Sequence, residues 1–141
     1  MNRVSAVVTA GLVLVAIGAC RSAGTADAPQ PAGALPRDVT PAMISLGDSL
    51  FNNGACRRCH GQAGVGGNNG PSLTTGAWLH GPGTFDRLVT TITTGVPRDS
   101  LKDTSRRFGM NPRGGPMQLT DDQVRAIAAY VHSISRAKTV Q

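Results

Sequence analysis

The residues best suited to chemistry lie together at Cys56-Arg57-Arg58-Cys59-His60. The two cysteines are three positions apart, about one helical turn, and a histidine follows directly. This C-x-x-C-H spacing is typical of c-type haem attachment, in which two thiols add to the two vinyl groups of one porphyrin. His60 then lies under the ring and ligates the iron. The motif predicts one covalent haem c, with iron bound by His60.

Three other interpretations of the motif explain less. A structural zinc site needs four ligands, and only His60, His80 and His132 accompany the cysteine pair as further soft ligands. A thioredoxin-like redox pair belongs in a βαβ context, which the sequence does not suggest. A plain disulfide suits an exported protein, but it leaves His60 without a role.

The elements that must position this motif are helices. Thr40 and Pro41 are a typical N-cap and first helical residue, and this helix ends near Asn53. A second helix is expected over 84–94, with Gly95 as its stop. The last helix begins with a capping box, Thr120-Asp121-Asp122-Gln123. Apolar residues repeat at helical spacing in all three, whereas no segment alternates like a strand. The prediction is an all-α domain whose connections are the Gly/Asn-rich loop 61–76 and the basic stretch 96–116.

The composition agrees with a domain built around a cofactor. The 141 residues include 18 Gly and 9 Pro but only five aromatic residues. Such a chain has little from which to build a core, and a bound cofactor is a common remedy. The formal charge is +6, with no Glu, which suggests an anionic partner surface. No pairing of nucleophile and base or of carboxylates indicates an enzyme, and no nucleic-acid partner is expected.

The N-terminus resembles an export signal. A positive start, Asn2-Arg3, is followed by an apolar stretch over 4–19 that ends Gly18-Ala19-Cys20. Small residues directly before a cysteine resemble a bacterial lipobox, which predicts a lipoprotein-type signal peptide at 1–19 and lipidation of Cys20. Residues 20–39 read as a flexible tether, and the folded domain is expected over 40–138. The expected location is the periplasmic side of a bacterial membrane, lipid-anchored. An ordinary signal peptide, and hence a soluble periplasmic protein, is the alternative.

Residues 40–136 resemble a class I monohaem cytochrome c domain. The segment Asn69-Gly70-Pro71-Ser72-Leu73 is similar to the G-P-x-L stretch that follows the haem motif in that family. The resemblance implies a cytochrome c-like fold of three to five short helices around one covalent haem, with His/Met ligation. It also implies a crossing of the first and last helices, at which Gly47 lets Tyr130 pack closely. By the same likeness, the Pro71 carbonyl accepts a hydrogen bond from His60 Nδ1 and Leu73 touches the haem.

The sixth ligand is expected to be Met110, with Met117 as the alternative. Both are soft thioethers before the last helix, but Met117 lies only three residues before Thr120. Met110 leaves a longer Gly- and Pro-containing loop, and Met110-Asn111-Pro112 is close to the family's Met-Pro pattern. The indole of Trp78 is either a hydrogen-bond donor to a haem propionate or a core residue.

His80 and His132 are expected to be solvent-exposed, His80 in a loop and His132 on the last helix. His80 is an alternative iron ligand if no Met binds the iron. The sequence therefore predicts a single-electron carrier that exchanges electrons with a redox protein or respiratory enzyme. The cations of the basic stretch have two interpretations: they dock onto an acidic partner surface, or they belong to a solvated loop without a binding role. The cations are Arg98, Lys102, Arg106, Arg107 and Arg113. A gas-binding sensor, with a weak or absent sixth ligand, is the rival function.

Overall fold

The computed structural model describes residues 34–136, so the predicted signal peptide and Cys20 lie outside the described part. Four α-helices occur in this range: α1 (Pro41–Asn53), α2 (Cys56–His60), α3 (Phe85–Thr94) and α4 (Asp121–Arg136). Three short 3-10 segments, Gln62–Gly64, Arg98–Ser100 and Pro112–Met117, lie in the connections. Over residues 34–136 the only β-type pairing is one antiparallel bridge, between Val96 and Met110. The all-α prediction is confirmed.

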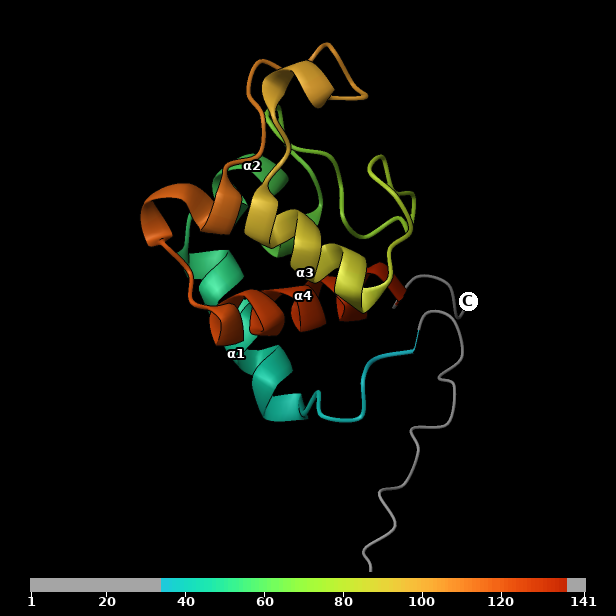
Figure 1. Ribbon diagram of the computed structural model, residues 1–141, viewed down its shortest axis with the longest axis vertical. Coiled ribbons are helices and arrows are strands. Elements are labelled where there is room, and N and C mark those ends of the chain that lie inside the picture. The colour runs from blue at the N-terminus through green and yellow to red at the C-terminus, as the bar shows by residue number, and fades with distance from the viewer. Residues whose placement is uncertain (1–33, 137–141) are drawn as a thin grey trace, which may run out of the picture.

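The frame of the domain is the crossing of α1 and α4 (Figure 1). Helix α1 begins as the sequence predicts, because Thr40 Oγ1 accepts a hydrogen bond from the Met43 amide at 3.2 Å. At the crossing, a Cβ on Gly47 would lie 2.0 Å from the Ala126 carbonyl oxygen. Only glycine lets the two backbones approach this closely. The rings of Phe51 and Tyr130 then meet with centroids 5.4 Å apart.

Helix α4 is covered on more than one side. Its capping box forms, with the Thr120 amide 3.0 Å from Gln123 Oε1 and the Gln123 amide 3.3 Å from Thr120 Oγ1. Both α1 and α3 pack against α4, so its residues 126–132 are all buried. The expectation that His132 faces solvent is therefore wrong, since this side chain is 2% exposed.

Helix α3 closes the core from the other side of α4. Phe85, Leu88 and Ile92 are its buried face, and the helix stops at Gly95, whose φ of +69° favours glycine. The frame thus leaves two long irregular connections, 61–84 and 95–117, beside α3 (Figure 1). Among residues 34–136, no helix combines the length and the apolar character that a membrane span requires.

Candidate haem-binding site

The C-x-x-C-H motif forms the short helix α2, directly after the end of α1. Phe51, on the last turn of α1, lies with its ring centroid 6.4 Å from that of His60. The turn between the helices needs glycine, because a Cβ on Gly54 would lie 2.4 Å from the Leu50 carbonyl oxygen. Cys56 and Cys59 are half-buried and are not joined in a disulfide. Burial raises the pKa of the Cys56 thiol against the opposing effect of a backbone hydrogen bond, and the charge of Cys59 raises it further.

The motif lines one cavity of about 500 Å³, a size typical of cofactor sites. Cys56, Cys59 and His60 all lie at its wall, together with apolar side chains from all three long helices. These are Phe51 of α1, Leu88 and Ile92 of α3, and Ile127 and Val131 of α4. A large apolar slot, with two thiols and an imidazole at its wall, fits the covalent haem that the motif predicts.

The orientation of His60 follows from one hydrogen bond. Its Nδ1 lies 3.0 Å from the Pro71 carbonyl oxygen, and because a carbonyl can only accept, Nδ1 carries the hydrogen. Burial lowers the pKa of His60, the bond to Pro71 raises it, and the charge of Arg106 lowers it. A neutral ring with its proton on Nδ1 has its lone pair on Nε2, which is the form that ligates a metal.

Residues 61–73, called the motif loop, hold Pro71 in this place. The amide of Gly66 donates to the His60 carbonyl oxygen at 2.6 Å, and that of Gly67 donates to the Gly70 carbonyl oxygen at 3.0 Å. Gly70 is buried against the motif, where a Cβ would lie 2.9 Å from His60 Nδ1. Leu73, whose amide donates to the Gly64 carbonyl oxygen at 2.8 Å, lines the cavity as the resemblance implies.

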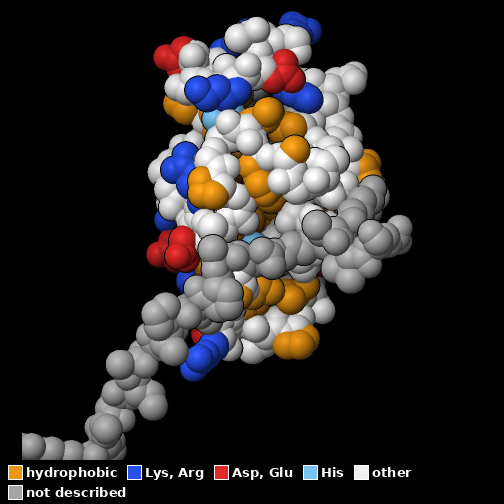
Figure 2. Space-filling view, turned by 90° about the vertical axis from the view of Figure 1, so that its right-hand side faces the viewer, with side chains coloured by type: hydrophobic (Ala, Val, Ile, Leu, Met, Phe, Trp, Pro, Cys, Tyr) orange, Lys and Arg blue, Asp and Glu red, His pale blue; other side chains and the backbone are white. Residues whose placement is uncertain are grey.

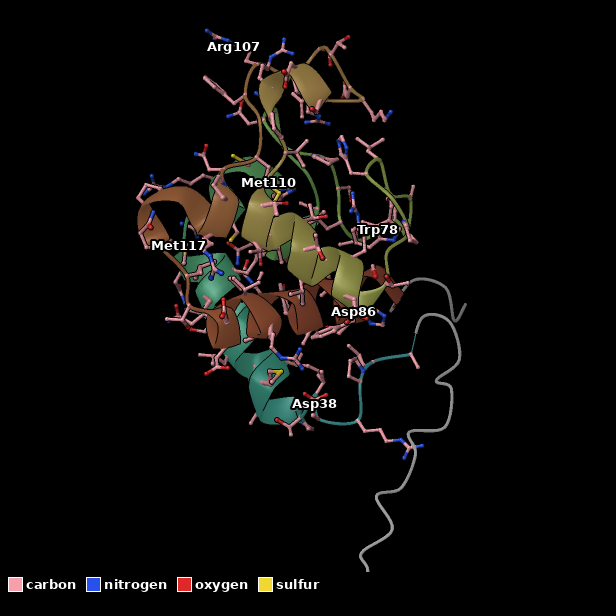
Figure 3. The ribbon with its side chains drawn as sticks, in the orientation of Figure 1. Asp38, Trp78, Asp86, Arg107, Met110 and Met117 are labelled. Carbon is pink, nitrogen blue, oxygen red and sulfur yellow. The ribbon has the colours of Figure 1, made fainter. Side chains whose placement is uncertain are left out.

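The two candidate methionines lie in different places (Figure 3). Met110 lines the cavity. Its amide and carbonyl pair with Val96 at 2.9 and 2.8 Å, which fixes the backbone beside the end of α3. Met117 does not line the cavity, since its sulfur accepts a hydrogen bond from the Ala55 amide at 3.0 Å and packs against Gly54. Of the two candidates, Met110 is therefore the one at the cavity.

In Figure 3, Trp78 and Met110 lie near opposite ends of α3, and Trp78 too lines the cavity. Its indole packs on the backbone of Gly83, where a Cβ would lie 1.7 Å from Nε1. His80 follows in the same loop. The expectation of an exposed His80 is wrong, because the residue is half-buried at the cavity wall, and its carbonyl oxygen accepts a hydrogen bond from Arg87 Nε at 3.1 Å.

The cations of the basic stretch do not share one environment. Arg113 turns inward, donating to the Leu119 carbonyl oxygen at 2.8 Å and pairing with Asp121 at 2.6 Å. Lys102 and Arg107 are exposed on the loop that projects from one end of the domain. Figure 2 shows Lys and Arg side chains at this end, with Asp side chains among them, above a hydrophobic stretch of surface. Arg106 is half-buried and lines the cavity. The expected cluster is therefore smaller than the sequence suggests.

Some residues of the site were missed by sequence reasoning. Phe108 is 56% exposed although it lines the cavity, and it has the Arg107 guanidinium over its ring at 5.6 Å. The pairing of Val96 with Met110 has no local signal, since fourteen positions separate them. One hint is present, because Gly95 and Gly109 each precede a bridge residue. A Cβ on either would lie within 2.5 Å of a carbonyl oxygen across the bridge.

Comparison with known proteins identifies the family of this chain. Residues 42–131 match the family described as cytochrome C oxidase, cbb3-type, subunit III. The chain is 38% identical to a cbb3-type cytochrome c oxidase subunit CcoP of Rubrivivax gelatinosus, over 77% of this chain and 31% of that protein. It is 36% identical to a subunit FixP of the same kind of oxidase from Sinorhizobium medicae, over 67% and 31%. The chain thus spans about a third of the length of these curated relatives.

A solved structure is also similar to the chain. The crystal structure of cytochrome CL from Methylophaga aminisulfidivorans has a TM-score of 0.51 and 29% sequence identity. The likeness covers 67% of this chain and 56% of that one. The cytochrome c-like fold that the resemblance implies is thereby confirmed.

Proposed function

This chain belongs to the family described as cytochrome C oxidase, cbb3-type, subunit III, and on that premise we propose that it carries single electrons on one covalent c-type haem. Cys56 and Cys59 would hold the porphyrin through thioether bonds, and His60 and Met110 would ligate the iron. When bound, the haem iron supplies the chemistry by cycling between Fe(II) and Fe(III). The observation that carries the proposal is the cavity, which these four side chains line together.

The remaining residues position and shield the site. Pro71 keeps the hydrogen of His60 on Nδ1 and so leaves Nε2 to the metal. The bridge to Val96 fixes the backbone of Met110. Leu73 and the buried faces of α3 and α4 exclude water, and Trp78 offers an indole N–H at the cavity wall for a propionate. With His60 and Met110 both bound to the iron, no position would be left for a substrate, so we propose that this chain transfers electrons and does not itself catalyse a reaction.

The partner follows from charge and from the relatives. The matched proteins are subunits of cbb3-type cytochrome c oxidases, so a respiratory enzyme is the proposed partner. Between residues 40 and 138 the sequence carries eleven Lys and Arg against six Asp. Exposed cations near the cavity, such as Arg58, Lys102 and Arg107, suit an acidic docking surface.

Export and anchoring remain proposals from the sequence. The junction Gly18-Ala19-Cys20 supports lipidation of Cys20 and a lipid anchor on the periplasmic side, ahead of the domain proposed over 40–138. Intact mass and detergent extraction test this, because Cys20→Ala should release the protein or block its processing. A mature chain that is cleaved elsewhere and carries no lipid would refute the anchor.

Optical spectra of the purified, oxidised and reduced protein test the proposed function. We expect the spectrum of a six-coordinate c-type haem, with the weak sulfur-to-iron absorption in the near red when the protein is oxidised. Carbon monoxide should bind the reduced protein slowly, because Met110 has to leave first. Rapid binding, with no sulfur-to-iron absorption, would replace the carrier with the gas-binding sensor.

A further inference from the structure

The segment that precedes Met110 is a loop with a closed base. Residues 97–109, called the ligand loop, leave the domain after Val96 and return at Met110, and the Val96–Met110 bridge joins the two ends. In Figure 1 the ligand loop projects from the domain beyond α3. Gly109 makes the closure possible, since a Cβ there would lie 2.5 Å from the Val96 carbonyl oxygen.

Most of the polar contacts of the ligand loop are internal. Arg98 donates from Nε to the Arg107 carbonyl oxygen at 3.2 Å, and Asp103 accepts from the Ser105 hydroxyl at 2.6 Å. None of residues 97–109 is fully buried. A loop with internal hydrogen bonds but little buried apolar surface has little to keep it on the domain, and such segments open at low free-energy cost.

One side chain connects the ligand loop to the other wall of the cavity. Arg106 pairs through Nε with Asp103 at 2.9 Å, and its Nη1 donates to the Gly67 carbonyl oxygen at 2.7 Å. Over residues 34–136, this is the one side-chain hydrogen bond from the ligand loop to another segment. Gly67 belongs to the motif loop and lies against α2, where a Cβ would be 2.8 Å from the Cys59 carbonyl oxygen.

Asp103 and the guanidinium of Arg106 are both suited to maintain the contact with Gly67. The hydroxyl of Ser105, followed by its amide and by Arg106, keeps the pKa of Asp103 below its usual value, so the carboxylate stays charged. The guanidinium is a planar fork that can address two acceptors at once through different nitrogens. A lysine ammonium in the same place could keep the charge but could not reproduce both directed contacts.

We propose that Arg106 is a positioning residue that ties the ligand loop to the motif loop and so keeps Met110 on the haem iron. The inference rests on the proposed function, because it takes Met110 to be the sixth ligand. Without the tie to Gly67, the ligand loop is held mainly by the bridge at its base. The thioether would then leave the iron more often and external ligands would enter more readily.

Imidazole binding to the oxidised, haem-loaded protein measures this opening. Arg106→Gln should raise the association constant for imidazole about tenfold, which corresponds to about 1.4 kcal/mol. It should also weaken the sulfur-to-iron absorption on warming. Arg106→Lys should behave like Arg106→Gln, because it keeps the charge and loses the two-way contact. Arg37→Gln, at an exposed position before α1 and with the same charge change, should leave imidazole affinity and absorption as in the unmodified protein.

Three results would overturn the proposal. Both Arg106 variants could bind imidazole like the unmodified protein. Arg106→Lys alone could do so, which would assign the effect to charge. The third result comes from hydrogen exchange, which distinguishes opening of the ligand loop from destabilisation of the whole domain. Faster exchange confined to the ligand loop and the Met110 amide supports the tie, whereas faster exchange throughout α1 and α4 contradicts it. Met110→Ala separates the two proposals, since an unchanged sulfur-to-iron absorption there would refute the ligand itself.

Discussion

The two walls of the cavity hold their proposed iron ligands in different ways. His60 belongs to a helical turn that directly follows α1, and its hydrogen-bond acceptor, Pro71, is eleven residues further on. Met110 instead pairs with Val96, fourteen residues earlier, and Arg106, four residues before Met110, donates a hydrogen bond to Gly67. The helical turn of the motif therefore places the first ligand, whereas the second depends on a backbone bridge and on the contact of Arg106 with Gly67, 39 positions earlier. Substitutions in the motif or at the crossing of α1 and α4 should therefore destabilise the whole domain. Substitutions on the Met110 side should affect mainly the binding of Met110 to the iron.

The largest effect should come from the motif itself. Cys56→Ala with Cys59→Ala removes the covalent attachment, and the cavity of about 500 Å³ then loses the apolar group around which the domain folds. We expect no covalent haem by mass spectrometry and a poorly folded domain by circular dichroism. A double variant that stays helical and unfolds at the temperature of the haem-loaded protein would contradict the coupling of attachment to folding.

Next in size is the helix crossing that carries the motif. Gly47→Ala places a Cβ 2.0 Å from the Ala126 carbonyl oxygen, and overpacking typically costs about 1–3 kcal/mol. Denaturant unfolding of the haem-loaded protein measures the loss. Ser45→Ala, an exposed position on the same helix, is the control and should change stability by less than about 0.5 kcal/mol. Equal stability of the two variants would mean that α1 shifts freely on α4.

On the Met110 side, the decisive comparison is between the two methionines. Met110→Ala should abolish the sulfur-to-iron absorption and lower the reduction potential, because a His/Met pair raises it. Met117→Ala should keep both, while it costs about 1–3 kcal/mol because the Ala55 amide loses its acceptor. Spectra and a redox titration of both variants check this. Loss of the absorption in Met117→Ala alone would make Met117 the ligand.

The same contrast explains what could be predicted from the sequence. The caps at Thr40 and Thr120, the stop at Gly95 and the one-turn motif are local signals, and each element lies where the sequence indicated. Two contacts join separate segments of the chain, and no periodicity in the sequence predicts them. These are the bridge between Val96 and Met110 and the contact between Arg106 and Gly67. The burial of His132 does not follow from helical spacing, because spacing indicates the face toward one neighbour, whereas α4 packs against both α1 and α3.

A smaller effect should follow from the base of the ligand loop. Gly109→Ala brings a Cβ within 2.5 Å of the Val96 carbonyl oxygen, so the bridge must widen and Met110 must move. We expect a weaker sulfur-to-iron absorption and faster carbon monoxide binding, with a loss of stability of about 1 kcal/mol. Thr104→Ala, exposed in the same loop, should change neither optical property. If Gly109→Ala and Thr104→Ala have the same optical properties, the bridge does not determine how Met110 binds the iron.

The smallest effect concerns the outer surface, where the two kinds of cation can be told apart. Lys102 and Arg58 are exposed, and their charges are available to an acidic partner, whereas Arg113 already pairs with Asp121. The double variant Lys102→Gln with Arg58→Gln should therefore slow electron transfer to an acidic redox partner a fewfold at low salt, because exposed charges steer association. It should also weaken the dependence of the rate on salt concentration, because salt ions screen such charges. Arg113→Gln should leave the rate and its salt dependence unchanged and affect only stability. Stopped-flow electron-transfer rates measured across a salt series test this prediction. A salt-insensitive rate in the unmodified protein would refute electrostatic docking.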